Sequence, residues 1–210
     1  MTRRLRTCRW LERELSMQLA TDTGTPVCHE DAHPPVQTIL LRMKAWDESL
    51  YKHARLTARL AARAGEILGL PRDERFSLVT GALLHDTGKI LWPAEMSYKS
   101  RLTSADLLLV RTHPESGYRH VQAQWPQAPP ETLDIIRQHH ERSDGSGYPA
   151  GLLGHQIHPL AKIVAALEAY AAMTEARAYR QYRYNHLEAV SQLLLSGHPE
   201  RLINLIPCVP

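Results

Sequence analysis

The chain has 210 residues, of which 43% are hydrophobic and 22% are charged, and its formal net charge is +3. This length favours one domain, because domains commonly span roughly 100–200 residues. The apolar fraction excludes a mainly disordered chain, and the small net charge does not indicate a protein that binds DNA or RNA. No apolar run approaches the roughly 18 residues of a membrane span, and the basic N-terminal segment lacks the apolar core of a signal peptide.

The three cysteines, Cys8, Cys28 and Cys208, are widely spaced and form no CxxC pair. This pattern predicts a cytoplasmic protein in a reducing compartment, without a disulfide framework.

Helices are predicted along most of the chain. Residues 8–20 fit a short amphipathic helix, and the proline-containing residues 21–35 fit an irregular linker. A long helical periodicity runs from about Val36 to Leu68 and ends at Gly69. Further helices are predicted at about 73–84, 103–112, 131–140 and 159–173, with Pro114 at the start of a short one.

The remaining segments agree with a helical chain. Residues 141–156 are rich in glycine, which disfavours a helix there. Asn185 and Glu188 resemble the capping box of a helix that ends near Gly197. Because strand-like alternation is absent, we expect an all-α fold, with an N-terminal extension over residues 1–40 and one domain over residues 41–210.

A set of imidazole and carboxylate side chains interrupts the apolar faces and ends of these predicted helices. Buried groups of this kind are costly unless they are paired or bind a metal. Five histidines with two carboxylates and no cysteine suit two divalent ions such as iron, manganese or zinc. The set is His53, His85, Asp86, His113, His139, His140 and Glu168.

Two of these groups belong to longer motifs. His85-Asp86 continues into Gly88-Lys89, and His139-His140 precedes the run from Asp144 to Pro149 that reads DGSGYP. Together with His113, these motifs resemble the HD-GYP branch of the HD phosphohydrolase superfamily over about residues 45–205. The resemblance implies a helical HD-domain bundle that hydrolyses the bacterial messenger cyclic di-GMP to pGpG or GMP. It also implies a site of two iron or manganese ions, with zinc, nickel or magnesium as alternatives.

Carried over by position, the resemblance implies a role for each motif residue. One ion would be held by His53, His85, Asp86 and Glu168, and the other by Asp86, His113, His139 and His140. Asp86 and Lys89 would be catalytic, and Lys89 and Tyr148 would contact the substrate. Arg177 and Arg180 would grip the dinucleotide, with Arg183 as a third candidate, in a stretch that reads L-T-S-x-R-x-Y-R in the family and Met173 to Arg180 here.

The sequence also departs from the family pattern. The family's Asp-x-x-Asp appears as Glu168 to Ala171, so a longer carboxylate replaces the first Asp and the second is lost. Because that second Asp is expected to support a metal ligand, we predict one tight ion at the later histidines and a weaker ion at His53, His85 and Glu168. Ser49 replaces the Glu of members with three metals, which predicts no third ion.

Three hypotheses follow. The first is an active phosphodiesterase that cleaves cyclic di-GMP. The second is a degenerate, non-catalytic module that contacts partners, with diguanylate cyclases bound through the GYP loop. The third is a phosphohydrolase for another nucleotide. The helix at residues 8–20 is a candidate oligomerisation element.

Overall fold

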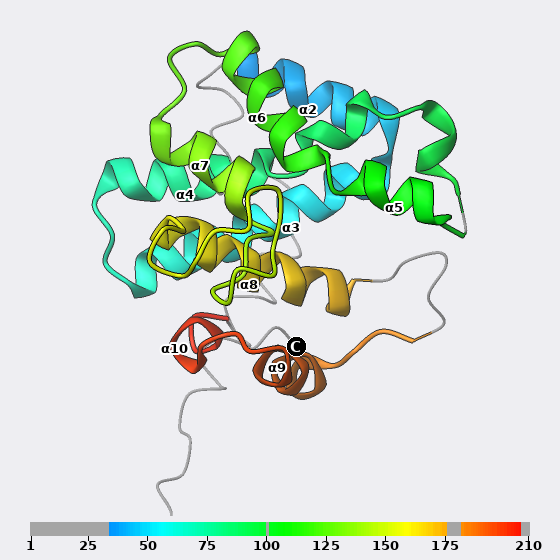
Figure 1. Cartoon of the computed structure of the whole chain (residues 1–210). Helices are drawn as coiled ribbons and strands as arrows, with labels where there is room; N and C mark the ends of the chain where they lie inside the picture. The colour runs from blue at the N-terminus through cyan, green and yellow to red at the C-terminus, as the bar shows by residue number, and fades with distance from the viewer. Residues whose placement is uncertain (1–33, 100, 176–181, 207–210) are drawn as a thin grey trace, which may run out of the picture.

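The computed structural model describes residues 34–99, 101–175 and 182–206. Within these ranges the chain is helical and has no strand, which confirms the all-α prediction (Figure 1). The α-helices are α2 (Pro34–Trp46), α3 (Glu48–Ile67), α4 (Arg72–Leu84), α5 (Ser104–Val110), α6 (His113–Gln124), α7 (Pro130–Gln138), α8 (Pro159–Thr174), α9 (His186–Leu195) and α10 (Glu200–Ile203). Two 3-10 helices, η2 (Thr87–Leu91) and η3 (Ala94–Ser97), follow α4.

The helix predicted over residues 36–68 is two helices, α2 and α3, separated at Asp47. Asp47 has extended backbone angles, and its carboxylate accepts a hydrogen bond from the backbone N–H of Ser49 at 2.7 Å. An N-cap of this kind begins a new helix although the apolar periodicity continues across it. The prolines at 34 and 35, predicted in a linker, form the first turn of α2, where a missing N–H costs no helical hydrogen bond.

Residues that are typical of helix starts are found at the first turns of three other helices. Asn185 and Glu188 form the capping box that begins α9. Thr103 and Asp106 form a second capping box at α5, and Pro114 lies in the first turn of α6. Each signal satisfies backbone N–H groups that a helix start would otherwise leave without partners.

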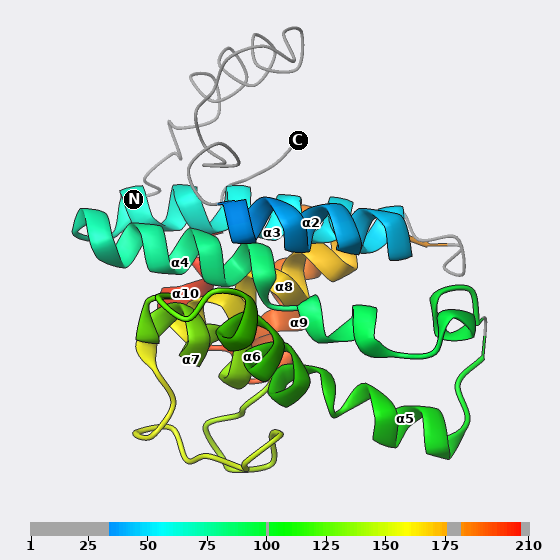
Figure 2. The same ribbon diagram turned by 90° about the horizontal axis from the view of Figure 1, so that it is seen from above.

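Helix α3 packs against α2, α4 and α8, and Figure 2 shows it beside α2 and α4 along one side of the bundle. Four fully buried alanines line its packed faces, namely Ala54, Ala58, Ala61 and Ala64. Small side chains allow neighbouring helices to approach closely, and α7 completes this core against α4 and α8. Helices α9 and α10 pack against α8 on its outer side (Figure 1).

The turn after α4 is in close backbone contact with the first turn of α6. A Cβ atom on Gly88 would lie 2.1 Å from the carbonyl oxygen of His113, so only glycine fits there. This contact fixes the residues around His85 and His113 relative to each other. Helix α5 and η3 project from the bundle beside this contact (Figures 1 and 2).

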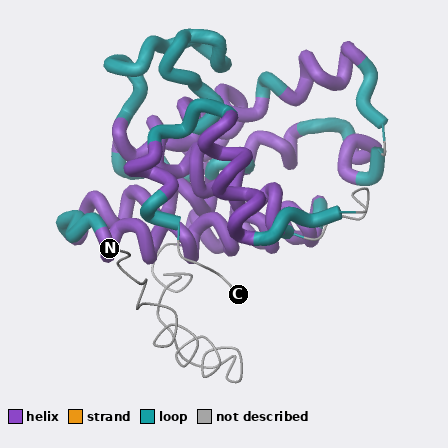
Figure 3. The backbone as a smooth tube through the Cα atoms, turned by 90° about the horizontal axis from the view of Figure 1, so that it is seen from below, coloured by secondary structure: helices purple, strands orange, loops and turns teal. Residues whose placement is uncertain are grey.

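Residues 139–158 connect α7 to α8 without a helix, as the glycine content predicted. This loop projects from the side of the bundle opposite α2 (Figures 2 and 3). Among the described helices, none combines the length and the apolar character that crossing a bilayer requires.

Candidate metal centre

The seven side chains predicted as metal ligands converge from five helices. His53 lies on α3, His85 and Asp86 follow α4, His113 begins α6, His139 and His140 follow α7, and Glu168 lies on α8. Five of them are at most 5% exposed, and His140 and Glu168 are half-buried. The fold therefore gathers residues that are up to 115 positions apart in the sequence.

Three of the histidines are oriented by backbone carbonyls. The Nδ1 atoms of His85, His113 and His139 lie 2.8, 2.7 and 2.9 Å from carbonyl oxygens three residues earlier, at Ala82, Val110 and Ile136. Each carbonyl is in the last turn of a helix, where the helix provides no N–H partner. Because a carbonyl only accepts, Nδ1 carries the proton in each ring and Nε2 presents a lone pair to the centre.

Two of these lone pairs face each other. The Nε2 atoms of His113 and His139 are 3.1 Å apart. Burial lowers the pKa of His113 to about 3, and burial with the charge of His140 holds the pKa of His139 well below its usual value. Two neutral rings at this distance have no proton to share, so the arrangement suits a cation that accepts both lone pairs.

Asp86 lies between His85 and His113. Its Oδ2 is 3.4 Å from Nε2 of His85, and its Oδ1 is 3.3 Å from Nε2 of His113. Burial raises the pKa of Asp86, but the positive charge of Lys89 acts against burial, and that pKa lies well below its usual value. Within the described part of the chain, neither Asp86 Oδ1 nor His85 Nε2 has a hydrogen-bond partner, as expected of atoms that bind an ion.

The donor atoms form three groups of three, each with all atoms within 4.8 Å of one another. The groups are His53, His85 and Glu168; His113, His139 and His140; and His85, Asp86 and His139. Imidazole and carboxylate donors without cysteine fit divalent iron, manganese or zinc, so the residues present fit the metals that the sequence implies.

Lys89 lies at the edge of this centre. Its Nζ donates a hydrogen bond to Asp86 Oδ2 at 2.6 Å, while a quarter of its side chain stays exposed, at 26%. The ammonium group thus lies between the Asp86 carboxylate and solvent.

His53 has a carboxylate partner that the sequence analysis did not identify. Oε2 of Glu175 is 2.7 Å from Nδ1 of His53. The loss of the second Asp at Ala171 therefore does not leave His53 without a carboxylate partner, because Glu175 supplies one from four positions further along. The weaker ion predicted at this group stays a prediction. The sequence marks position 175 as a departure, since Glu175 stands where the related family stretch has Ser, but it does not indicate the contact with His53.

The glycine-rich loop is held against the centre by Tyr148 and Glu141. The ring of Tyr148 stacks on His140, with centroids 4.7 Å apart and planes 27° apart. Burial raises the pKa of the Tyr148 hydroxyl, and the charge of Glu168 acts in the same direction. The buried Glu141 accepts hydrogen bonds from the N–H groups of Ala150 at 2.7 Å and Leu152 at 2.9 Å, which ties the loop back to the end of α7.

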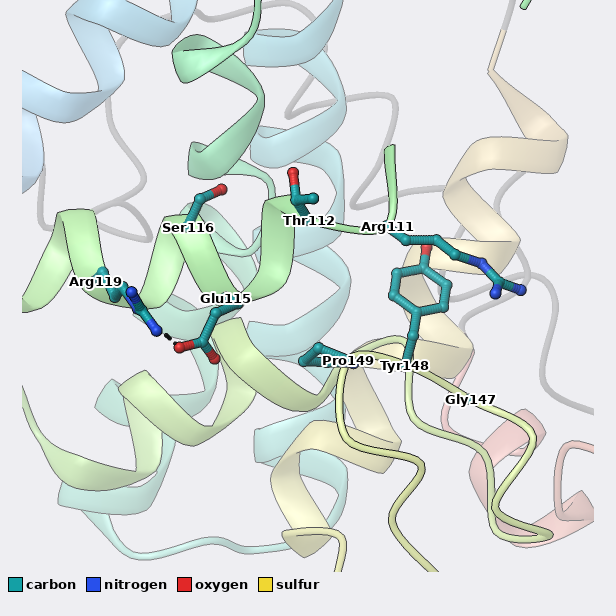
Figure 4. Close-up of a pocket in the computed structure, with 8 residues that line it drawn as sticks. All are labelled: Arg111, Thr112, Glu115, Ser116, Arg119, Gly147, Tyr148 and Pro149. Carbon is teal, nitrogen blue, oxygen red and sulfur yellow. Dashed lines mark hydrogen bonds and ion pairs between the residues drawn. The ribbon is translucent and has the colours of Figure 1, made fainter. Parts of the chain in front are cut away.

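A cavity of about 550 Å³ opens beside the second ligand group (Figure 4). Thr112, directly before His113, and Tyr148, stacked on His140, both line it. The guanidinium of Arg111 lies over the Tyr148 ring, 5.4 Å from its centroid. Arg111 was not predicted as a site residue, although it is only two positions before His113. The full lining is Arg111, Thr112, Glu115, Ser116, Arg119, Gly147, Tyr148 and Pro149.

Some predicted functional residues cannot be placed in this centre. Arg177 and Arg180 lie outside the described residues, as do the predicted N-terminal helix and most of the extension over residues 1–40. Arg183 is described and exposed. The grip on the substrate and the oligomer through residues 8–20 stay predictions.

The fold and the centre define a helical domain with clustered imidazole and carboxylate donors that suit divalent metals. The family model described as "HD domain" matches residues 40–198, and the chain belongs to this family. The predicted resemblance to the HD-GYP branch is confirmed by relatives that are cyclic di-GMP phosphodiesterases and by the solved structure of an HD-GYP-type protein.

The curated relatives are phosphodiesterases of cyclic dinucleotides. A cyclic di-GMP phosphodiesterase of Pseudomonas aeruginosa is 35% identical over 79% of this chain and 40% of its own length. The cyclic di-GMP phosphodiesterase response regulator RpfG of Xanthomonas campestris is 35% identical over 59% of this chain and 33% of its own. The 3'3'-cGAMP-specific phosphodiesterase 1 of Vibrio cholerae is 32% identical over 62% of this chain and 30% of its own. The chain thus spans less than half the length of these relatives.

Solved structures share the fold. Bd1817, a HDGYP protein from Bdellovibrio bacteriovorus, has a TM-score of 0.60 and 25% identity, over 81% of this chain and 58% of that one. The HD domain of the phosphodiesterase PgpH from L. monocytogenes has a TM-score of 0.57 and 16% identity, over 82% of this chain and 93% of that one. The second likeness concerns the fold alone.

Proposed function

We propose that this chain is a metal-dependent phosphodiesterase that hydrolyses cyclic di-GMP to pGpG or GMP. The observation that carries the proposal is the position of Asp86, whose two oxygens face one histidine from each half of the centre at 3.4 and 3.3 Å. A carboxylate in that position suits the bridge of a two-metal site. The curated relatives that carry out this reaction support the choice of substrate.

One set of residues would bind the metal ions, and another set would bind the substrate. His53, His85 and Glu168 would hold one ion, and His113, His139 and His140 the other, with Asp86 shared. Iron or manganese is the proposed metal. When bound, the two ions would supply Lewis acidity and a water activated for attack on phosphorus.

The residues around the centre suit a dianionic substrate. Lys89 would place its ammonium group at the edge of the site, where negative charge on the phosphate oxygens increases during attack. Tyr148 and Arg111 would bind the nucleotide in the adjoining cavity, because an aromatic face stacks on bases and a guanidinium pairs with phosphate. Arg177 and Arg180 would complete the grip.

A second substrate has support of its own. Three curated relatives from Vibrio cholerae are specific for 3'3'-cGAMP, one of them 32% identical to this chain. We therefore propose hydrolysis of 3'3'-cGAMP as the alternative activity. It needs the same metals and attack on the same kind of phosphodiester, so only the contacts to the bases would differ.

The test compares both substrates on one preparation. Protein purified without oxygen and loaded with Mn²⁺ or Fe²⁺ is incubated with cyclic di-GMP or 3'3'-cGAMP, and the products are identified by chromatography. Asp86→Ala should abolish turnover, whereas His155→Ala should retain it, because His155 is exposed and outside the centre. Absence of hydrolysis of either substrate by folded, metal-loaded protein would refute the proposed function.

Partners and location follow from the proposed substrate. We propose that diguanylate cyclases bind the loop over residues 144–149, much of which is exposed. Because the proposed substrate is made inside bacterial cells, the proposed location is the cytoplasm. Copurification of a tagged cyclase with the parent, lost when Ser146 and Pro149 are both changed to Ala, would support the contact.

A further inference from the structure

His53 differs from the other histidines of the centre in how its ring can be oriented. His85, His113 and His139 lie at helix boundaries, where free carbonyls of a last turn accept their Nδ1–H groups. His53 is the sixth residue of the 20-residue helix α3, where carbonyls are engaged in the helix. Its ring must therefore be held by a side chain from another element.

Glu175 is placed to hold it. This residue directly follows α8, and its N–H donates a hydrogen bond to the Ala171 carbonyl, which fixes the backbone at the helix end. Its Oε2 is 2.7 Å from Nδ1 of His53, and the two side chains are 19% and 7% exposed. A carboxylate only accepts, so Nδ1 carries the proton and Nε2 is left as the nitrogen that can bind an ion.

Helix α8 and the residue directly after it supply the two carboxylates around His53. Glu168 joins His53 and His85 in one ligand group, and Glu175, seven residues later, contacts the other nitrogen of the His53 ring. Ala171, between them, is fully buried and offers no carboxylate. Position 175 lies four residues after position 171, which corresponds to about one helical turn, or about 6 Å along the axis.

We propose that Glu175 is a positioning residue for the metal site of His53, His85 and Glu168. Its carboxylate holds His53 in the tautomer that binds an ion through Nε2. Glu175 thereby takes the role of the carboxylate that is missing at Ala171. A carboxylate on the far nitrogen also raises the basicity of the ligating one, and partners of this kind typically contribute about 10–100-fold in metal affinity. The inference rests on the proposed two-metal centre for its functional part. The tautomer of His53 can be measured without any metal.

The experiment compares Glu175→Ala and Glu175→Gln with a matched control, Glu66→Ala. Glu66 is exposed and pairs only with Arg63 in the described structure, so its removal changes charge without touching the centre. The Gln variant keeps an oxygen that accepts the His53 N–H but loses the negative charge. It therefore separates orientation of the ring from electrostatic support.

The first measurement is of metal-free protein. Imidazole ¹H–¹⁵N correlation spectra at a pH where the rings are neutral should show His53 as the Nδ1–H tautomer in the parent, Glu66→Ala and Glu175→Gln. Glu175→Ala should populate the Nε2–H tautomer. The same tautomer in Glu175→Ala as in the parent would overturn the positioning role, whether or not the protein is an enzyme.

The second measurement is of Mn²⁺ binding, by titration and by metal analysis after dialysis. Glu175→Ala should retain the ion at His113, His139 and His140 and bind the other ion about 10–100-fold more weakly, with Glu175→Gln between it and the parent. Equal affinity for both ions in Glu175→Ala and the parent would refute the role. If the parent itself binds no metal, the proposed function fails, and the tautomer result still decides the role of Glu175.

Discussion

The Nε2 atoms of His113 and His139 lie 3.1 Å apart, although each ring already donates its Nδ1–H to a backbone carbonyl. Two neutral imidazoles do not approach in this way for a hydrogen bond, because neither has a proton to offer. The carbonyl groups at two helix ends thus orient both rings so that their Nε2 lone pairs point toward one shared position, which suits a cation.

Removing a histidine from the ligand group of His113, His139 and His140 should remove one ion. His113→Ala or His140→Ala should reduce the metal content of anaerobically purified protein from about two ions per chain to about one, because each variant takes a donor from a three-residue group. Inductively coupled plasma mass spectrometry measures this directly. His155→Ala serves as the control, and full metal content in both centre variants would show that these residues are not ligands.

Glu168→Ala should affect the other ion. Glu168 is the carboxylate of the group with His53 and His85, so its loss should abolish the rise in activity on adding Mn²⁺ while the ion at His113 is kept. Activity assays over a Mn²⁺ series, combined with metal analysis, check both parts. A variant that hydrolyses cyclic di-GMP as fast as the parent would exclude Glu168 as a ligand.

Lys89→Ala should lower kcat by about 10²–10³-fold, comparable to the loss of one donor to a developing oxyanion. Its ammonium group lies 2.6 Å from Asp86 yet is partly exposed toward the open side of the centre. Lys89→Arg keeps the charge and should retain more of the rate. Steady-state kinetics with measured metal content separates this effect from metal loss, and unchanged kcat in the Ala variant would assign Lys89 a structural role.

Arg111→Ala should act on substrate binding. Because its charge lies over Tyr148 in the cavity beside His113 and His140, it would meet the substrate in ground and transition states alike. Loss of such uniform binding raises KM more than it lowers kcat. The double variant Arg177→Ala/Arg180→Ala is expected to behave in the same way. Arg201→Ala, at an exposed position on α10, is the control, and a parental KM in Arg111→Ala would contradict the prediction.

The metal-free protein should lose stability as the pH falls below about 6.5. Burial lowers the pKa of His113 to about 3 and that of His139 well below its usual value, so the unfolded chain binds more protons than the native one in this range. The free energy of unfolding then rises with pH by about 1.4 kcal/mol per unit for each such histidine. Urea unfolding at pH 5, 6 and 7 measures this slope. His113→Ala should reduce it by about one histidine's share, whereas His155→Ala should not.

Much of the architecture could be predicted from local sequence. The capping box at Asn185, the proline at 114 and the glycine-rich stretch after His140 mark helix starts and a loop because each acts through its own backbone neighbours. The break at Asp47 was missed because the apolar periodicity runs through it. Only the side chain of Asp47 accepting from Ser49 reveals that a new helix begins there.

The sequence by itself determined the candidate donors of the centre, because His-Asp, His-His and the GYP loop are contiguous motifs whose residue types already favour particular metals. Only the tertiary structure decided how those residues are supported. The bond between Glu175 and His53 joins positions 122 residues apart, and the cavity of Arg111 and Tyr148 is made by two segments that meet only in the folded chain. Such contacts depend on how α8 packs against α3 and how the loop folds back on α6. No local pattern encodes them, because they result from the packing of the whole bundle.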